Sequence, residues 1–321
     1  MNVLNLLFAA GVAGFAFASH AEYKTCEALF QKGIYRDALD TCKQAAVTDK
    51  RANYFIARIY ERGVEVSIDK NEARVHYAQA AEAGVIDAKL RIGLMYLHGI
   101  GGNRNVDMGL KYLEDAADHG DFLAQNELGL IYISDNFRYK DQNRAFHFFQ
   151  KSAEQGFPIA QYNLAISYEN GRGIEKDVYK AAFWFMKSAQ GGDKHAQKKL
   201  AALYLHGIGV EKNLKEGLKW LTESAMQGLV ESQVSLSFIH MYGKFGVTKD
   251  AYKAFIWSSI AAESDDMRAV KLNRFAKNEL DEENLGKAEI EILTLRQKIA
   301  GKLNQLSSDD EYQEFDINKI K

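Results

Sequence analysis

Proline, long hydrophobic stretches and an excess of either charge are missing from most of this 321-residue sequence. The single proline, Pro158, and glycines that recur at intervals instead of clustering exclude Pro-rich or Gly-rich linkers, so we expect one continuous array. Alternating runs of Val, Ile and Thr are absent too, whereas 47% of the residues are hydrophobic and Ala, Leu, Lys and Glu are abundant. The composition therefore predicts an all-α protein with a sizeable core.

Charge and known chemical motifs exclude several functions. The 41 Lys and Arg residues nearly balance 43 Asp and Glu residues, and the formal charge of −2 provides no long-range positive field for nucleic acid or an anionic membrane. Gly-rich phosphate loops, His-Glu-x-x-His, Gly-x-Ser-x-Gly and clustered carboxylates do not occur. We therefore expect no nucleic-acid partner, no cofactor and no catalytic residues.

The one long apolar stretch lies at the N-terminus, from Val3 to Ala18, and it ends in the small residues Ala18, Ser19 and Ala21. This pattern predicts a signal peptide over residues 1–21 and an exported, periplasmic or secreted protein without stable membrane insertion after cleavage. The absence of Lys and Arg before the apolar stretch leaves an uncleaved signal as the alternative.

Small, aromatic and glycine residues recur every 36 residues without gaps. Alanine occupies one phase seven times, at Ala45, Ala81, Ala117, Ala153, Ala189, Ala225 and Ala261. A second column consists of Tyr60, Tyr96, Tyr132, Tyr168, Tyr204 and His240, and a third of Gly84, Gly120, Gly156, Gly192 and Gly228. A fixed period of this size predicts stacked supersecondary units that bury their apolar faces against one another.

Each repeat has the pattern of a helical hairpin. Apolar residues at helical spacing form one face at Ala160, Leu164, Ala165 and Tyr168, and another at Ala181, Phe185 and Ala189. Gly171 and Gly192 are expected to terminate the two helices. N-cap residues are expected at Asp69, Asn105, Asp141, Asp177 and Asn213, with Glu72 and Glu216 as capping-box partners.

These columns resemble the Sel1-like repeat, the 36-residue relative of the tetratricopeptide repeat. The matching residues run from Ala160 to Ala165, from Tyr168 to Ile174 and from Asp177 to Ala181, and they continue at Ala189 and Gly192. The resemblance implies a right-handed α/α solenoid of helical hairpins. It also implies binding of other proteins, as the family commonly does in assembly, signalling and host contact.

The domain organisation follows from where the period begins and stops. We expect a tetratricopeptide-like hairpin at 22–48, six repeats at 51–264, capping helices at 265–306 and a disordered tail at 307–321. The third repeat replaces its glycine loop with residues 135–140, and the sixth carries a shifted loop at 243–246. Divergence of a solvent loop and a binding edge are both consistent with these changes.

Cys26 and Cys42 lie eight residues to either side of Ile34. Ile34 falls in the predicted turn between the first two helices. Because a short turn places mirror positions of antiparallel helices opposite each other, an oxidising compartment predicts a disulfide, with two reduced core thiols as the alternative. Histidine offers no metal site, since His98 and His206 lie three repeats apart.

The first helix of each hairpin lines the concave face in the related tetratricopeptide fold. Carried over by column, this geometry defines a predicted binding row: Tyr54, Arg58, Glu61, Leu90, Leu94, Leu97, Asn126, Leu130, Ile133, Tyr162, Ile166, Glu169, Lys198, Leu205, Val234, Phe238 and Met241. The middle of the row is apolar, which suits an extended or helical peptide. Burial of the Leu94 and Leu97 columns between hairpins is the alternative.

The sequence thus predicts a non-catalytic, monomeric scaffold that binds a protein or peptide. Two alternatives stay open. Some Sel1-like proteins were described as β-lactam-binding or β-lactam-hydrolysing, but those carry a cysteine pair in each repeat, and Ser-x-x-Lys with Ser-Asp-Asn is absent here. A structural factor of the cell envelope that contacts peptidoglycan is the other alternative.

Overall fold

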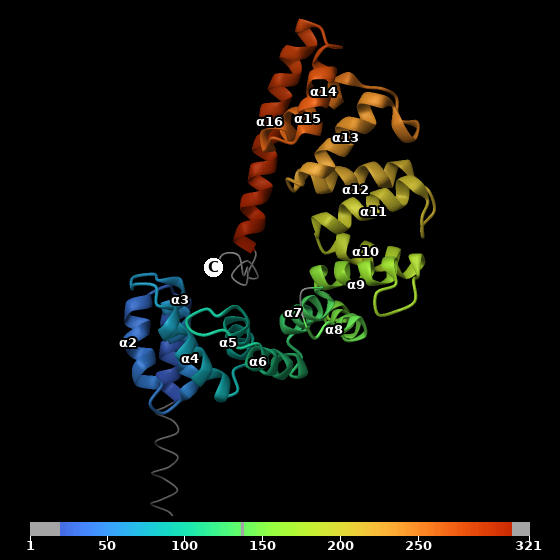
Figure 1. The fold of residues 1–321 in the computed structure, drawn as a ribbon. Helices are drawn as coiled ribbons and strands as arrows, with labels where there is room; N and C mark the ends of the chain where they lie inside the picture. Colours follow the sequence, from blue (N-terminus) through green and yellow to red (C-terminus); the bar gives the residue numbers. More distant parts are fainter. Residues whose placement is uncertain (1–19, 136–137, 310–321) are drawn as a thin grey trace, which may run out of the picture. The chain divides into compact units, whose positions relative to one another are not determined.

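The computed structural model describes residues 20–135 and 138–309, and within these ranges every regular element is helical (Figure 1). The predicted signal peptide therefore lies outside the described residues, apart from residues 20 and 21. The chain divides into two compact units between Leu128 and Gly129, inside one helix.

Unit 1 begins with a helix at residues 20–31, which forms the N-terminal hairpin together with α2, and continues with the first repeats. Its further elements are α2 (Tyr35–Ala45), η1 (Lys50–Ala52), α3 (Asn53–Arg62), α4 (Lys70–Glu82), α5 (Ile86–His98), α6 (Val106–Asp118) and the first part of α7 (Phe122–Ile133).

Unit 2 contains the remaining repeats and the C-terminal helices. Its elements after α7 are α8 (Gln142–Glu154), α9 (Pro158–Asn170), α10 (Val178–Gln190), α11 (Lys194–His206), α12 (Leu214–Met226), α13 (Val230–Tyr242), η2 (Lys244–Gly246), α14 (Ala251–Ala261), η3 (Ala262–Ser264), α15 (Met267–Lys277) and α16 (Glu282–Asp309).

Consecutive helices pack against each other along the chain, as a solenoid of hairpins requires. In unit 1, α3 pairs with α4 and α5 with α6, and α4 packs on α5. In unit 2, α9 pairs with α10, α11 with α12 and α13 with α14, with each hairpin packed on the next. The predictions of an all-α fold and a solenoid of paired helices are confirmed.

Each of the five predicted N-cap residues bonds both helices of its repeat, the following one through its side chain and the preceding one through its backbone N–H group. The side-chain oxygen of Asp177 accepts from the backbone N–H groups of Tyr179 and Lys180 at 3.0 Å. Its own backbone N–H donates to the carbonyl of Tyr168 at 3.0 Å. The same two-way bonding recurs at Asp69, Asn105, Asp141 and Asn213, whose amides donate to the carbonyls of Tyr60, Tyr96, Tyr132 and Tyr204.

This bonding corrects one expectation. Glu72 and Glu216 do not complete a capping box, because the N-cap amide that a capping-box glutamate would accept from already donates to a carbonyl of the preceding helix. The carboxylate of Glu72 instead lies 3.7 Å from His76, and that of Glu216 lies 3.4 Å from Lys219.

The loop between the helices of a repeat contains a glycine that approaches the preceding repeat closely. A Cβ atom on Gly173, which has φ +71°, would lie 2.0 Å from the carbonyl oxygen of Gln142 at the start of α8. A Cβ atom on Gly209 would lie 2.4 Å from the carbonyl oxygen of Val178 at the start of α10. The glycine therefore serves both the left-handed turn and the contact between neighbouring repeats.

The N-terminal hairpin is closed by the predicted disulfide. Cys26 and Cys42 are bonded, with an S–S distance of 2.02 Å and a Cα–Cα distance of 4.9 Å, and both are fully buried. They belong to a core cluster that also contains Leu39, Phe55 and Ile56. The disulfide thus links the two helices of the N-terminal hairpin within this core.

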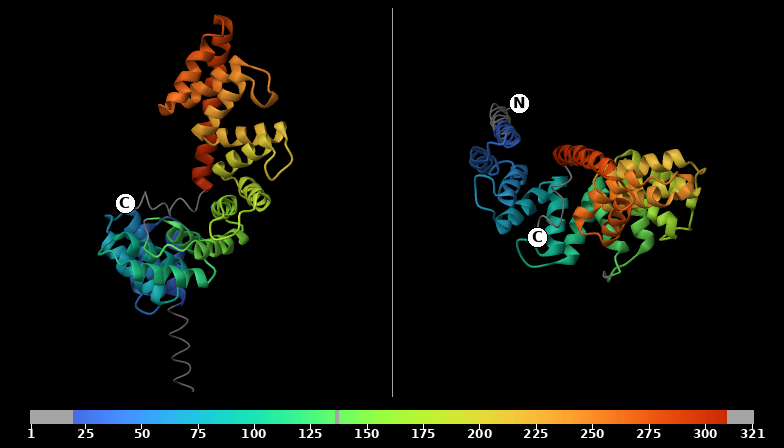
Figure 2. Two further views of the ribbon diagram at one scale, coloured as in Figure 1. Left: turned by 45° about the vertical axis from the view of Figure 1, so that its right-hand side comes forward. Right: turned by 90° about the horizontal axis from the view of Figure 1, so that it is seen from above.

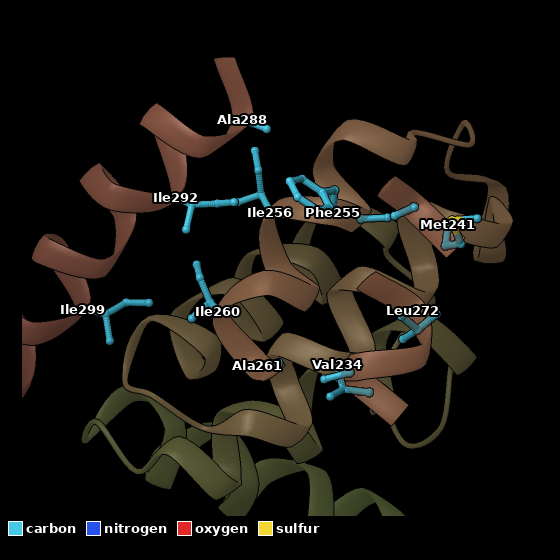
Figure 3. Close-up of a cluster of buried hydrophobic side chains, with 13 residues drawn as sticks. Val234, Met241, Phe255, Ile256, Ile260, Ala261, Leu272, Ala288, Ile292 and Ile299 are labelled. Carbon is cyan, nitrogen blue, oxygen red and sulfur yellow. The ribbon is translucent and has the colours of Figure 1, made fainter. Parts of the chain in front are cut away.

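The C-terminal end of unit 2 is covered by α15 and α16, and the predicted capping helix is confirmed. Ala288, Ile292 and Ile299 of α16 point toward Ile256 and Ile260 of α14 in one buried cluster (Figure 3). Figure 2 shows α16, in red, beside the last repeats. It is 28 residues long and contacts both α14 and α12.

The described helices include none that has the length and apolar character for crossing a bilayer. Helix α16 continues to Asp309, so residues 307–309 of the predicted tail are helical, and residues 310–321 lie outside the described part of the chain.

Candidate functional site

A groove of about 690 Å³ opens in unit 2. We call it the C-terminal groove, and it is lined by residues of α9, α11, α12, α13, η2 and α15: Tyr162, His195, Lys198, Lys199, Ala202, Leu205, His206, Leu221, Val234, Ser235, Phe238, Ile239, Tyr242, Phe245, Arg268, Lys271, Leu272 and Phe275. Its volume lies in the range of cavities that hold small molecules or a few side chains.

Helical spacing explains why these side chains converge. Helix α11 contributes His195, Lys198 and Ala202, at intervals of three and four residues that place them on one face. Helix α13 contributes Val234, Phe238 and Tyr242 by the same rule, and α15 contributes Arg268, Lys271, Leu272 and Phe275. Three helices therefore present one stripe each to a common space.

The floor and the rim of the groove differ in character. Buried aliphatic side chains form the floor: Leu205, Leu221, Val234, Ile239 and Leu272. Three aromatic side chains stand above it with about half of their surface exposed, Phe238 at 44%, Tyr242 at 48% and Phe275 at 53%. Exposed aromatic rings over an apolar floor are typical of sites that anchor a partner side chain.

The charged side chains that line the groove are all basic. Lys199 forms an ion pair of 2.8 Å with Glu169, and Arg268 forms one of 2.6 Å with Asp266. The hydrogen bond from Arg268 holds the pKa of Asp266 well below its usual range. Lys198 and Lys271 make no ion pair with any described residue, so they leave positive charge available at the rim.

Phe245 enters the groove from a strained backbone position. It has φ +59°, whereas Gly173 and Gly209 occupy the equivalent position in two earlier repeats. A left-handed conformation costs a residue with a Cβ atom about 1–2 kcal/mol. Strain of this kind gathers at functional sites, and here it accompanies a perpendicular contact between the rings of Phe245 and His206.

Five residues of the predicted binding row line the C-terminal groove: Tyr162, Lys198, Leu205, Val234 and Phe238. Leu130 is exposed and Ile133 and Ile166 are partly buried, but none of them lines it. Glu169 contributes indirectly through Lys199, and Met241 is buried in the C-terminal core. The structure therefore brings together only the C-terminal part of the row.

The apolar part of the row in unit 1 is buried. Leu90, Leu94 and Leu97 have exposed fractions of 1%, 3% and 6%, and Asn126 is buried as well. A Cβ atom on Gly109 of α6 would lie 2.7 Å from Leu97, so this leucine fills the space between the helices of its own hairpin. These leucines are buried, as the alternative interpretation expects, but Leu97 packs within its own hairpin and not between hairpins.

The first residues of the row are joined in a polar network. The hydroxyl of Tyr77 donates to Glu61 at 2.6 Å, and Arg91 donates to the other carboxylate oxygen at 3.3 Å. Arg58 donates to the hydroxyl of Tyr54 at 2.9 Å. Burial raises the pKa of Tyr77 well above its usual value, which keeps the phenol protonated as the donor in this network.

Sequence periodicity missed the side of the groove that α15 forms. Arg268, Lys271 and Phe275 follow the last repeat, so no column of the period assigns them a place. Phe245 had a signal, because its loop departs from the glycine pattern of the other repeats. Over the described ranges, no group of three or more His, Cys, Asp or Glu side chains could hold a metal ion.

A family model described as the Sel1 repeat matches six segments of the chain, at residues 50–85, 86–121, 123–157, 158–193, 194–229 and 230–266. The chain therefore belongs to the Sel1 repeat family. Proteins of this family are scaffolds that mediate protein–protein interaction, and the family is generally not enzymatic.

Two solved structures are similar over most of the chain. A protective antigen of uropathogenic Escherichia coli strains, which displays an SLR fold, is 26% identical with a TM-score of 0.77 over 90% of this chain. A Sel1 repeat protein from Oxalobacter formigenes is 30% identical with a TM-score of 0.67, and the match covers 75% of this chain and 99% of that one.

The chain spans only part of two of these relatives. It covers 63% of the E. coli chain. Chitin synthase regulatory factor 3 of Schizosaccharomyces pombe is 38% identical over 66 residues, which are 20% of this chain and 7% of the yeast protein. The disulfide and the bacterial relatives are consistent with an exported protein.

Proposed function

We propose that this protein is a non-catalytic scaffold of the periplasm or the secreted space that binds an extended segment of a partner protein in the C-terminal groove. The observation that carries the proposal is the combination of an aliphatic floor with three half-exposed aromatic rings, within a fold whose family mediates protein interactions. The groove takes side chains of a peptide, and the basic rim contacts its polar groups.

Export is supported by two independent features. The first is the apolar stretch before Glu22 in the sequence. The second is the disulfide, since cysteine pairs persist in oxidising compartments and are rare in the cytosol. Fractionation of cells that express the full chain should place it outside the cytosol with Cys26 and Cys42 joined, and a cytosolic protein with free thiols would contradict this part.

Site-specific photocrosslinking tests the groove. A photoreactive phenylalanine analogue is placed at Phe238 or Phe275, inside the groove, and in a control chain at Tyr179, whose side chain is 75% exposed on α10 and outside it. Irradiation in the native compartment should yield the same crosslinked protein from both groove positions and not from Tyr179. Equal crosslinking from all three positions would show that the groove does not direct binding.

Catalysis by the same protein has a direct control. Purified protein incubated with a chromogenic β-lactam should give no more hydrolysis than a heat-treated sample. Turnover well above that background would replace the scaffold proposal with the enzymatic alternative.

A further inference from the structure

The C-terminal groove is complementary to a segment of this chain itself. The segment from Asp310 to Ile317 carries four acidic residues, Asp310, Glu311, Glu314 and Asp316. Three large apolar side chains alternate with them, namely Tyr312, Phe315 and Ile317. Acidic and aromatic side chains in alternation are what a basic rim above an apolar floor would recognise.

The charges of the groove favour this occupant. Its lining includes Lys198, Lys199, Arg268 and Lys271 and no Asp or Glu. Lys199 and Arg268 already form ion pairs with Glu169 and Asp266, respectively. The positive charge that an acidic segment can pair with is therefore that of Lys198 and Lys271. Two carboxylates of the segment can satisfy these lysines while its aromatic rings pack on Phe238 and Phe275.

The path of α16 brings the segment within reach. Lys302 of α16 forms an ion pair of 2.9 Å with Glu223 of α12, two residues along from Leu221 in the groove floor. Leu303 lies against Gly228, at the turn that leads from α12 into α13. An extended chain from Asp309 reaches about 20–22 Å to Phe315 and about 26–29 Å to Ile317. Since a pair of packed helices is about 20 Å thick, this length is sufficient to pass from α16 around one hairpin to the groove.

We propose that residues 310–317 bind in the C-terminal groove of their own chain and compete there with the partner. This inference rests on the proposed function only for the competition, because docking of the segment can be measured without a partner. Since a tethered segment acts at an effective concentration in the millimolar range, even a weak contact is sufficient for occupancy.

The first experiment places a photoreactive phenylalanine analogue at Phe315 of the full chain. Crosslinks within one chain, mapped by mass spectrometry to peptides of α11, α13 or α15, are the expected result. Crosslinks between two chains would assign the segment to the groove of a second copy and overturn the intramolecular proposal. Crosslinks that avoid all three helices would overturn the docking itself.

The basic rim provides a matched pair of variants. Lys198→Glu with Lys271→Glu should reduce the Phe315 crosslinks to these helices at least fivefold. Lys176→Glu with Lys215→Glu changes the net charge equally at exposed positions outside the groove and should leave the crosslinks unchanged. Equal losses in both double variants would reduce the effect to net charge and contradict a specific site.

Competition is tested with a fluorescent peptide of residues 308–319. The full chain with Tyr312→Ser and Phe315→Ser should bind this peptide on the order of tenfold more tightly than the wild-type chain, because its own segment no longer occupies the groove. Equal affinities would overturn the competition. If Phe315 does not crosslink to the groove while Phe238 still crosslinks a partner, the proposed function stands without this inference. If neither position gives its expected crosslinks, the groove is not a binding site.

Discussion

The ring of Phe245 meets the ring of His206 edge to face, with centroids 5.0 Å apart. Phe245 belongs to the sixth repeat and His206 to the end of α11 in the fifth, so the contact joins two neighbouring hairpins at the groove. The backbone of Phe245 is left-handed at φ +59°, where a glycine would fit without strain. A phenylalanine thus occupies a position whose backbone conformation favours glycine.

Replacing Phe245 separates the contribution of the ring from that of the backbone. Phe245→Gly and Phe245→Ala both remove the ring, but only the alanine variant keeps a Cβ atom in the left-handed region. We expect the glycine variant to be more stable than the alanine variant by about 1 kcal/mol, measured by thermal or urea unfolding. Binding of the fluorescent 308–319 peptide is compared among chains that all carry Tyr312→Ser and Phe315→Ser. In this background, both Phe245 variants should bind the peptide at least fivefold more weakly than the chain with Phe245 intact. An alanine variant as stable as the glycine variant would show that the backbone stores no strain.

The contact between loop and preceding repeat gives a second prediction. Gly173→Ala places a Cβ atom 2.0 Å from the carbonyl of Gln142, so either the loop or α8 must move. We expect a loss of about 3 kcal/mol, from a left-handed alanine and an overpacked contact together.

Gly192→Ala is the matched control for that loss. Gly192 has φ +94°, but no atom lies within 4 Å of the Cβ position, so only the backbone term applies. Its cost should be about 1–2 kcal/mol. Unfolding midpoints that fall equally in the two variants would contradict a close contact between the repeats.

Much of this architecture was predictable because repetition averages out local ambiguity. Seven alanines in one phase fix the hairpin length, and Asp177 and its equivalents fix where the second helix begins. The capping box failed for a tertiary reason, since Asp69 uses its amide to bond Tyr60 across the loop. A local motif cannot show that its acceptor has been replaced by a carbonyl from another helix.

The candidate site was harder to predict, because periodicity identifies a face and not its exposure. Leu97 and Leu205 occupy equivalent positions three repeats apart and are both buried, so their shared column does not indicate that Leu205 forms part of the floor of the C-terminal groove. The groove at Leu205 is completed by side chains of α15, which follows the last repeat. Residues after the last repeat belong to no column of the 36-residue period, so the sequence pattern could not place them at the groove.

The disulfide should stabilise the N-terminal hairpin in particular. Cys26→Ala with Cys42→Ala removes a cross-link that contributes about 3 kcal/mol in the chain-entropy model. Hydrogen exchange should therefore accelerate in residues 20–31 and α2, while α10 and α11 in unit 2 retain their protection. Reduction of the wild-type protein should reproduce the pattern, and unchanged exchange in α2 would contradict a stabilising role.

Glu127 makes stability depend on pH. Loss of water around its carboxyl group raises the pKa from 4.5 to about 7, although a hydrogen bond with Asn126 acts in the opposite direction. Below about pH 4.5 the group is protonated in both states, and its folded-state penalty is absent. As the pH rises toward 7 the unfolded chain ionises first, so this group lowers the free energy of unfolding by up to roughly 3 kcal/mol.

Glu127→Gln should remove that dependence, since the amide has nearly the same shape and does not ionise. We expect the stability of the variant relative to wild type to increase between pH 5 and pH 8 by about 2–3 kcal/mol, measured by urea unfolding at both values. Glu175→Gln, at an exposed loop position, corrects for the loss of one negative charge. Wild-type and Glu127→Gln proteins whose stabilities change in parallel with pH would show that Glu127 ionises alike in the folded and unfolded chain.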